Sequence, residues 1–99
     1  MHARVTTIQM DPTKVDQAVS QLEEDEIPRW REIDGFKGFT LLVDHDSGKV
    51  VGTSYWDSAE QMRASEDAIR PSRERAVQTG GASGSPQVEV FEVAVDTET

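Results

Sequence analysis

The sequence predicts an α+β fold whose elements follow one another in the order β-α-β-β-α-β. Three observations lead to this prediction. A β-hairpin pattern occupies the middle of the 99-residue chain. A helix pattern with its own start signal stands on each side of the hairpin. Runs rich in β-branched residues lie near both ends of the chain and supply the two remaining strands.

The hairpin is predicted from two β-rich runs, residues 36–43 and 50–56, which flank the turn-forming segment 44–48. Gly48 can adopt a positive φ, and the Asp and Ser side chains before it can bond to nearby backbone, so a short antiparallel connection is favoured. The first run is apolar on both faces, with Phe39, Leu41 and Val43 on one and Phe36 and Leu42 on the other. Because a sheet that is wet on one side shows apolar residues on one face only, we expect both faces to be covered.

The first helix is expected over residues 11–34. Asp11 is a good N-cap, and Pro12 suits the first helical position because its missing N–H would have no intrahelical partner there. Pro28 should kink the helix, since proline removes one backbone donor and crowds the preceding turn. Gly35 then supplies the C-terminal stop signal.

The second helix is expected to begin at Asp57 or Ser58, each of which starts a capping-box pattern. It should run to about Ala68, break or kink at Pro71, and continue as far as Thr79.

The outer strands are expected at residues 3–10 and 87–95, and the glycine- and serine-rich segment 80–86 is a flexible connector to the last strand. The completed order is the split βαβ arrangement of ferredoxin-like domains. Two helices then cover one face of a four-stranded antiparallel sheet, and residues 1–99 form one domain. The opposite face stays open unless a partner covers it.

Composition predicts a homodimer that does not bind polyanions. The chain has 19 acidic and 10 basic side chains, which give a net charge of −9. The bulky apolar content is low for that charge, so a monomer would be marginal and a homodimer joined through the open sheet face is expected. Nucleic acid and anionic membranes are excluded as partners, because both need clustered Lys and Arg.

Cysteine and histidine usage argues against metal and disulfide chemistry. The chain has no cysteine and two isolated histidines, His2 and His45, so neither a dedicated metal site nor a disulfide is expected. Residues 1–10 lack the apolar segment of a signal peptide, and we expect a cytoplasmic protein.

Several motifs resemble the antibiotic biosynthesis monooxygenase-like family of the dimeric α+β barrel superfamily. They are Ile-Asp-Gly-Phe-Lys-Gly-Phe at 33–39, the turn at 43–49, the run from Trp56 to Glu66, and the closing strand at 88–93. The resemblance implies a dimeric α+β barrel with a ligand cavity between helices and sheet, and oxidation of an aromatic or polycyclic phenol by O₂ without a cofactor. Haem-degrading relatives carry a tryptophan and a histidine where this chain has Ser65 and Glu74, so haem binding is not expected.

The inner stripe of the second helix is unusually small. Residues that recur at three- and four-residue steps share one helix face, and here they are Met62, Ser65, Ile69, Ser72 and Ala76. One interpretation is a cavity between this helix and the sheet that takes a small aromatic ligand. The other is a helix that packs closely on the sheet and needs small residues to do so.

Three large amphipathic side chains, Trp30, Tyr55 and Trp56, are candidates for stacking on a planar ligand. The alternative for each is ordinary packing in the core or in the dimer interface. Tyr55 and Trp56 are neighbours on a strand and must point to opposite faces, so at most one of them lines a cavity on the helix side.

Charged candidates are Glu26 and two arginines. Glu26 falls on the apolar stripe four residues before Trp30 and could act as a general base toward a phenol, unless the kink at Pro28 turns it into solvent. Arg70 and Arg73 could bind an acidic substituent, unless they form a solvated face. The predicted ligand-binding set is therefore Glu26, Trp30, Tyr55, Trp56, Met62, Ser65, Ile69 and Arg73.

Two functions stay open at this point. The first is a small-molecule-binding protein that acts as a cofactor-independent monooxygenase on a phenol. The second is a non-catalytic ligand-binding module with a stress or regulatory role. No catalytic base or metal-ligand group in the sequence decides between them.

Overall fold

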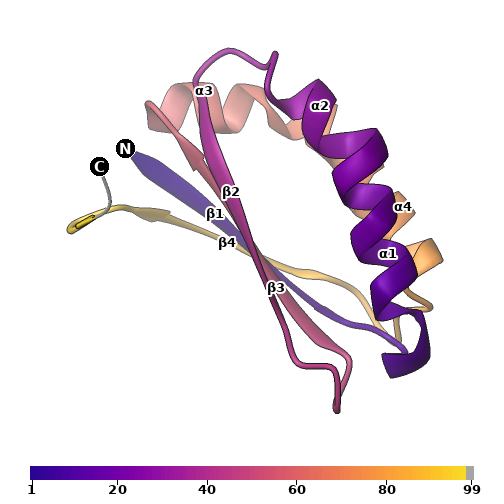
Figure 1. Ribbon diagram of the computed structural model, residues 1–99. Coiled ribbons are helices and arrows are strands. Elements are labelled where there is room, and N and C mark those ends of the chain that lie inside the picture. The colour runs from indigo at the N-terminus through magenta and orange to yellow at the C-terminus, as the bar shows by residue number, and fades with distance from the viewer. Residues whose placement is uncertain (98–99) are drawn as a thin grey trace.

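The computed structural model describes residues 1–97 and has the predicted β-α-β-β-α-β order (Figure 1). Four strands pair antiparallel in the order β2-β3-β1-β4. They are β1 (His2–Gln9), β2 (Phe36–Val43), β3 (Lys49–Trp56) and β4 (Gln87–Glu92). Helices cover one face of this sheet, and the other face is bare (Figure 1). The ferredoxin-like α+β fold is therefore confirmed.

The helical layer consists of two segments. The first contains a 3₁₀ turn η1 (Pro12–Lys14), helix α1 (Val15–Gln21), a π-helical turn η2 (Leu22–Glu26) and helix α2 (Ile27–Trp30). The second contains α3 (Ala59–Ala64) and α4 (Glu66–Thr79). No helix within residues 1–97 is both long enough and apolar enough to cross a membrane.

Both predicted helix starts are present. The Asp11 carboxylate accepts a hydrogen bond of 2.9 Å from the Thr13 N–H and caps the first segment. The Ser58 hydroxyl accepts a bond of 3.1 Å from the Gln61 N–H and caps α3. Each cap satisfies one of the backbone donors that a helix N-terminus leaves without an intrahelical partner.

The distortion expected at Pro28 is a π-turn placed directly before it. The Ile27 N–H reaches back five residues to the Leu22 carbonyl, instead of four. A π-turn absorbs the backbone disturbance near a proline without ending the helix. The turn also directs Glu26 into the protein, where its side chain is 2% exposed. The first helix ends at Trp30, and the expectation that it extends to residue 34 is wrong.

The break in the second helix lies at Ser65, six residues before the expected position at Pro71, which α4 accommodates in its interior. The Met62 carbonyl accepts bonds from the Ser65 hydroxyl at 2.6 Å and from Arg4 Nη2 at 2.6 Å. These side chains compete with the backbone for that carbonyl and interrupt the helix there.

Strand register decides which side chains face the helices. Residues directly opposite one another in an antiparallel pair lie on the same face, and Arg4 pairs with Ser54 and Thr6 with Gly52. Trp56 lies on this face as well, and a register shift between Phe36 and Gly38 brings Phe36 to it. Phe36 contacts Trp56 edge-on at 5.5 Å between ring centroids. The prediction that Phe36 shares a face with Leu42 is therefore wrong.

The face away from the helices is uncovered within one chain. Leu42 and Phe91 on this face are exposed. The edge strand β4 ends at Glu92 and not at residue 95, and its Val88 and Val90 lie on the helix side but are also exposed. The expectation that both faces are covered is not met by a single chain.

Candidate functional site

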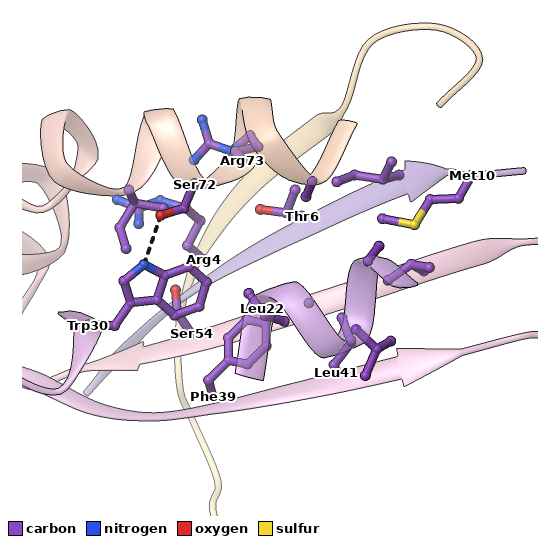
Figure 2. Close-up of a pocket in the computed structure, with 17 residues that line it drawn as sticks. Arg4, Thr6, Met10, Leu22, Trp30, Phe39, Leu41, Ser54, Ser72 and Arg73 are labelled. Carbon is purple, nitrogen blue, oxygen red and sulfur yellow. Dashed lines mark hydrogen bonds between the residues drawn. The ribbon is translucent and has the colours of Figure 1, made fainter. Parts of the chain in front are cut away.

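A cavity of about 80 Å³ lies between the helices and the sheet (Figure 2). Apolar side chains form most of its wall, namely Ile8, Met10, Ala18, Val19, Leu22, Trp30, Phe39, Leu41, Val50, Ile69 and Ala76. Gly52 and a small polar group complete it, namely Arg4, Thr6, Ser54, Ser72 and Arg73. An apolar chamber with a few placed polar groups is the usual form of a small-molecule site.

Gly52 lies on the sheet side of the cavity and leaves space for the Phe39 ring. A Cβ atom at this position would lie 3.0 Å from Cζ and 3.2 Å from Cε1 of Phe39. The absence of a side chain therefore lets the Phe39 ring lie over the strand. The same ring contacts Trp30 edge-on, with 5.0 Å between centroids, and both aromatic residues line the cavity.

A groove of about 550 Å³ adjoins the cavity. Four residues line both spaces, namely Val19, Leu22, Phe39 and Leu41. The groove lies between the first helical segment and the edge strand β2, where Glu23, Arg31 and Lys37 supply polar groups. A ligand too large for the inner cavity has room to extend into the groove if these shared side chains move aside.

Trp30 is held by a chain of buried hydrogen bonds. Its Nε1–H donates to the Ser72 hydroxyl at 3.1 Å, and that hydroxyl donates to Glu26 Oε1 at 2.9 Å. Figure 2 shows the indole pointing its nitrogen at Ser72 on α4. Because each bond fixes the next donor, the ring has a defined orientation at the cavity end.

Glu26 is fully engaged in an ion pair. Arg75 Nε donates to Oε2 at 2.6 Å and Arg75 Nη2 donates to Oε1 at 2.7 Å. The pKa of Glu26 is lowered chiefly by these bonds from Arg75 and further by Ser72, although burial opposes the shift. A carboxylate with both oxygens occupied and a lowered pKa is a weak base. Glu26 also does not line the cavity. The structure therefore argues against the general-base hypothesis, and it equally argues against the alternative that Glu26 faces solvent.

Arg4 is a buried guanidinium on the sheet side of the cavity, 4% exposed. Its Nη2 donates to the Met62 carbonyl at 2.6 Å and to the Ser65 hydroxyl at 3.1 Å. The guanidinium carbon lies 5.8 Å from the centre of the Trp56 ring. The Trp56 Nε1–H donates to Ser54 at 2.9 Å, so the ring beneath Arg4 is also fixed.

Arg73 approaches the cavity from α4. Its two terminal nitrogens donate to the Glu66 carboxylate at 2.9 Å each. Arg4 Nε lies 3.5 Å from the same carboxylate. The pKa of Glu66 is lowered, mainly by its hydrogen bonds with Arg73. Two arginines thus share one acid at this end of the cavity.

The structure brings part of the predicted ligand-binding set together. Trp30, Ile69 and Arg73 line the cavity. Trp56 and Met62 are buried in the packed cluster beside it. Ser65 is buried and hydrogen-bonded but does not line the cavity, and Arg70 is exposed and does not line it either.

Tyr55 lies on the opposite face of the sheet. It pairs with Ala3, one residue before Arg4 on β1, and alternation places its ring away from the helices. Tyr55 therefore cannot stack on a ligand in the cavity of its own chain. The prediction that Tyr55 is a ligand-stacking residue there is wrong.

Arg4 is the charged cavity residue that sequence reasoning missed. A signal was present, because every second residue of the predicted strand belongs to one face, and these residues are Arg4, Thr6, Ile8 and Met10. If Ile8 and Met10 face a core, Arg4 must face it too. A charged side chain on a buried strand face marks either an ion pair or a ligand site.

No family model matches the sequence. Two proteins of Mycobacterium tuberculosis strain H37Rv are similar to it, both described as uncharacterized. Rv2558 is 39% identical over 95 residues, which cover 96% of this chain and 39% of the relative. Rv2557 is 37% identical over 94 residues, which cover 95% of this chain and 41% of the relative. The chain thus spans about two fifths of the length of the curated relatives it matches.

Solved structures match the architecture over almost the whole chain. The monooxygenase from ActVA-Orf6 of Streptomyces coelicolor, in complex with nanaomycin D, has a TM-score of 0.80 at 22% identity, covering 99% of this chain and 91% of that one. A structure described as an antibiotic biosynthesis monooxygenase has a TM-score of 0.72 at 12% identity, covering 96% of this chain and 100% of that one. The fold is that of the antibiotic biosynthesis monooxygenases. SnoaB, a cofactor-independent oxygenase from Streptomyces nogalater, shares this fold at a TM-score of 0.70 and 13% identity, covering 99% and 97% of the two chains. The family resemblance of the sequence motifs is confirmed at the level of fold.

Proposed function

We propose that this chain binds a small aromatic molecule in the cavity between the helices and the sheet. The observation that carries the proposal is the cavity itself, which is mostly apolar, is lined by the paired Trp30 and Phe39 rings, and has a few buried polar groups. Aromatic side chains in an edge-on pair offer ring faces and edges to a planar ligand.

The dimensions set the size of the ligand. A cavity of about 150 Å³ takes a benzene ring, and the inner cavity here measures about 80 Å³. A single ring therefore requires Phe39 or Leu22 to turn aside. A polycyclic compound needs the groove as well, and the residues shared by the two spaces lie on that path.

Oxygenation of a bound phenol is the second candidate function. It is supported by fold neighbours that are described as a monooxygenase and as a cofactor-independent oxygenase. In such a reaction a phenol loses its proton and reduces O₂ itself, so that one oxygen atom enters the ring as a quinone oxygen and the other leaves as water. The chain's contribution is positioning and stabilisation of the substrate anion. Glu26, paired with Arg75, does not serve as the base.

One experiment tests both candidates. Binding of a panel of hydroxyanthraquinones and simple naphthols is followed by calorimetry and by the tryptophan fluorescence, which comes from Trp30 and Trp56, while an oxygen electrode records turnover. Binding with O₂ uptake supports the oxygenase, and binding without uptake leaves the non-catalytic module. If no member of the panel binds at millimolar concentration, the cavity is not a ligand site and the proposal fails.

We also propose that the functional form is a homodimer joined through the bare sheet face. Leu42 and Phe91 are exposed there, and Tyr55 lies between their strands. Burying about 800 Å² per partner is the standard size for a stable interface. A cytoplasmic location and a single domain over residues 1–99 stay predictions from composition and length.

A further inference from the structure

Two guanidinium nitrogens of cavity-lining arginines have no hydrogen-bond acceptor among residues 1–97. They are Arg4 Nη1 and Arg73 Nε, and both atoms are buried. Both residues line the cavity, and Figure 2 shows them nearer to Trp30 than to Met10. Arg4 is 4% exposed and Arg73 is 12% exposed, so bulk water cannot easily replace the missing acceptors. A buried donor without a partner is costly, and proteins seldom retain one without a use for it.

The charge balance points in the same direction. Arg4 and Arg73 both contact the same acidic side chain, Glu66. The exposed Arg70 also forms an ion pair with Glu66 at 3.5 Å and a second one with Asp67 at 3.5 Å. The pKa of Arg4 is lowered, first by burial and also by the neighbouring Arg73, with Glu66 opposing. The cavity end therefore has one positive charge more than its own carboxylate balances.

Arg4 is also held in a fixed direction. Its Nη2 is bound to Met62 and Ser65, and the plane of the group lies near the Trp56 ring. Fixing one side of a planar guanidinium fixes where the remaining Nη1–H groups point. A donor of this kind is prepared for an anionic oxygen before the ligand arrives, which reduces the entropy lost on binding.

We propose that Arg4 Nη1 and Arg73 Nε form an anion-recognition point that selects aromatic ligands bearing a carboxylate or phenolate oxygen. This inference rests on the proposed ligand-binding function and narrows its substrate class to aromatic acids and acidic phenols. The ring of such a ligand lies against Trp30 and Phe39, and its anionic oxygen lies toward β1 and α4. Charge-assisted hydrogen bonds to arginine are the strongest polar contacts available to such a group.

The first test uses the wild-type protein and three bicyclic probes, 2-naphthoate, 2-naphthamide and 2-naphthol, measured by calorimetry at pH 7. We expect 2-naphthoate to bind about tenfold or more tightly than the neutral amide, because one charge-assisted bond to a buried donor is worth that factor or more. Bound 2-naphthol should show the absorption band of its anion at a pH where the free compound is neutral. If naphthoate is preferred and naphthol stays neutral, the arginines recognise a carboxylate. If the anion band of naphthol appears, they also recognise a phenolate.

The outcomes separate this inference from the proposed function. If the amide binds as tightly as naphthoate and naphthol stays neutral, the anion-recognition point is refuted while the cavity remains a ligand site. If none of the three probes binds, both fail.

The second test uses variants. Arg4→Gln and Arg73→Gln should each lower the ratio of naphthoate affinity to amide affinity from about tenfold or more toward about one. The matched control is Arg70→Gln, on the same helix and in contact with the same Glu66, but 53% exposed and outside the cavity lining. It should keep the preference. Because Arg4 also ties β1 to α3, its variant must show native circular dichroism, and Arg73→Gln decides the matter if it does not. If the Arg70 and Arg73 variants lose the preference for naphthoate to the same extent, general surface charge and not the buried donors causes the preference, and the proposal is overturned.

Discussion

Replacing Glu26 with Gln tests whether its buried ion pair is structural. The Glu26→Gln side chain keeps the length and can still accept from Ser72, but it loses the charge that holds Arg75 by two bonds of 2.6 and 2.7 Å. Arg75 is 37% exposed and regains water when released, so the cost falls below that of stranding a fully buried charge. A lost charge-assisted bond costs about 2 kcal/mol, which corresponds to a fall of about 10 °C in Tm for a chain of this size.

The pH dependence gives the sharper assay. The pKa of Glu26 is lowered in the folded protein, so its ion pair stabilises the fold above the unfolded value of about 4.3 and this contribution is lost as pH falls through the folded value. Thermal unfolding of wild type and Glu26→Gln, at equal protein concentration, should therefore show a Tm gap at pH 7 that closes toward pH 3. Glu24→Gln, at an exposed position on the same helix, is the control and should leave Tm nearly unchanged.

A Tm gap of the same size at pH 3 and pH 7 would contradict the ion-pair argument, since protonated Glu26 closely resembles Gln. A catalytic role makes a different prediction. If Glu26 is the base, the variant loses turnover of a phenol at pH 7 even at temperatures where it is fully folded.

Three further predictions follow from the cavity, the bare sheet face and Trp30. Ala76→Leu adds three carbons at the wall of an 80 Å³ space, which holds two to three groups of about 30 Å³ each; it should abolish binding of 2-naphthamide without lowering Tm, and lost stability would show a wall already packed. The pair Leu42→Arg and Phe91→Arg should convert a dimer of twice the 11.0 kDa chain mass to a monomer in light scattering, while an unchanged mass would place the interface elsewhere. Trp30→Phe removes the Nε1–H bond to Ser72 and should cost about 1 kcal/mol in chemical denaturation; a loss below 0.5 kcal/mol (about half the usual value) would show that the bond is not needed.

The element order, the helix caps and the hairpin were predictable because each depends on local signals. Asp11 with Pro12 and Ser58 with Gln61 are short-range patterns, and the structure has a cap at both places. Positive φ at Gly48, at 82°, likewise follows from a turn that needs it.

The interior polar contacts were not predictable in the same way. Glu26 meets Arg75 across 49 residues of sequence, and Arg4 meets Ser65 across 61. Which partner each finds depends on a π-turn before Pro28 and on a break at Ser65, where Arg4 from β1 binds the Met62 carbonyl. The face taken by Phe36 depends on a bulge that alternation alone does not show.

The π-turn over Leu22–Glu26 holds one residue more than a regular helical turn. Val19 and Leu22 before the turn line the cavity, while Glu26 and Trp30 after it enter the hydrogen-bond chain with α4. Because the turn closes from residue i+5 to residue i through about the same rotation as a regular turn closed from i+4, losing one residue here would restore regular winding and leave both halves of the helix facing the sheet. A homologue with a one-residue gap at this turn should therefore keep the same pocket, whereas a gap in the regular turns on either side would rotate the following residues by about 100° and mark a different pocket.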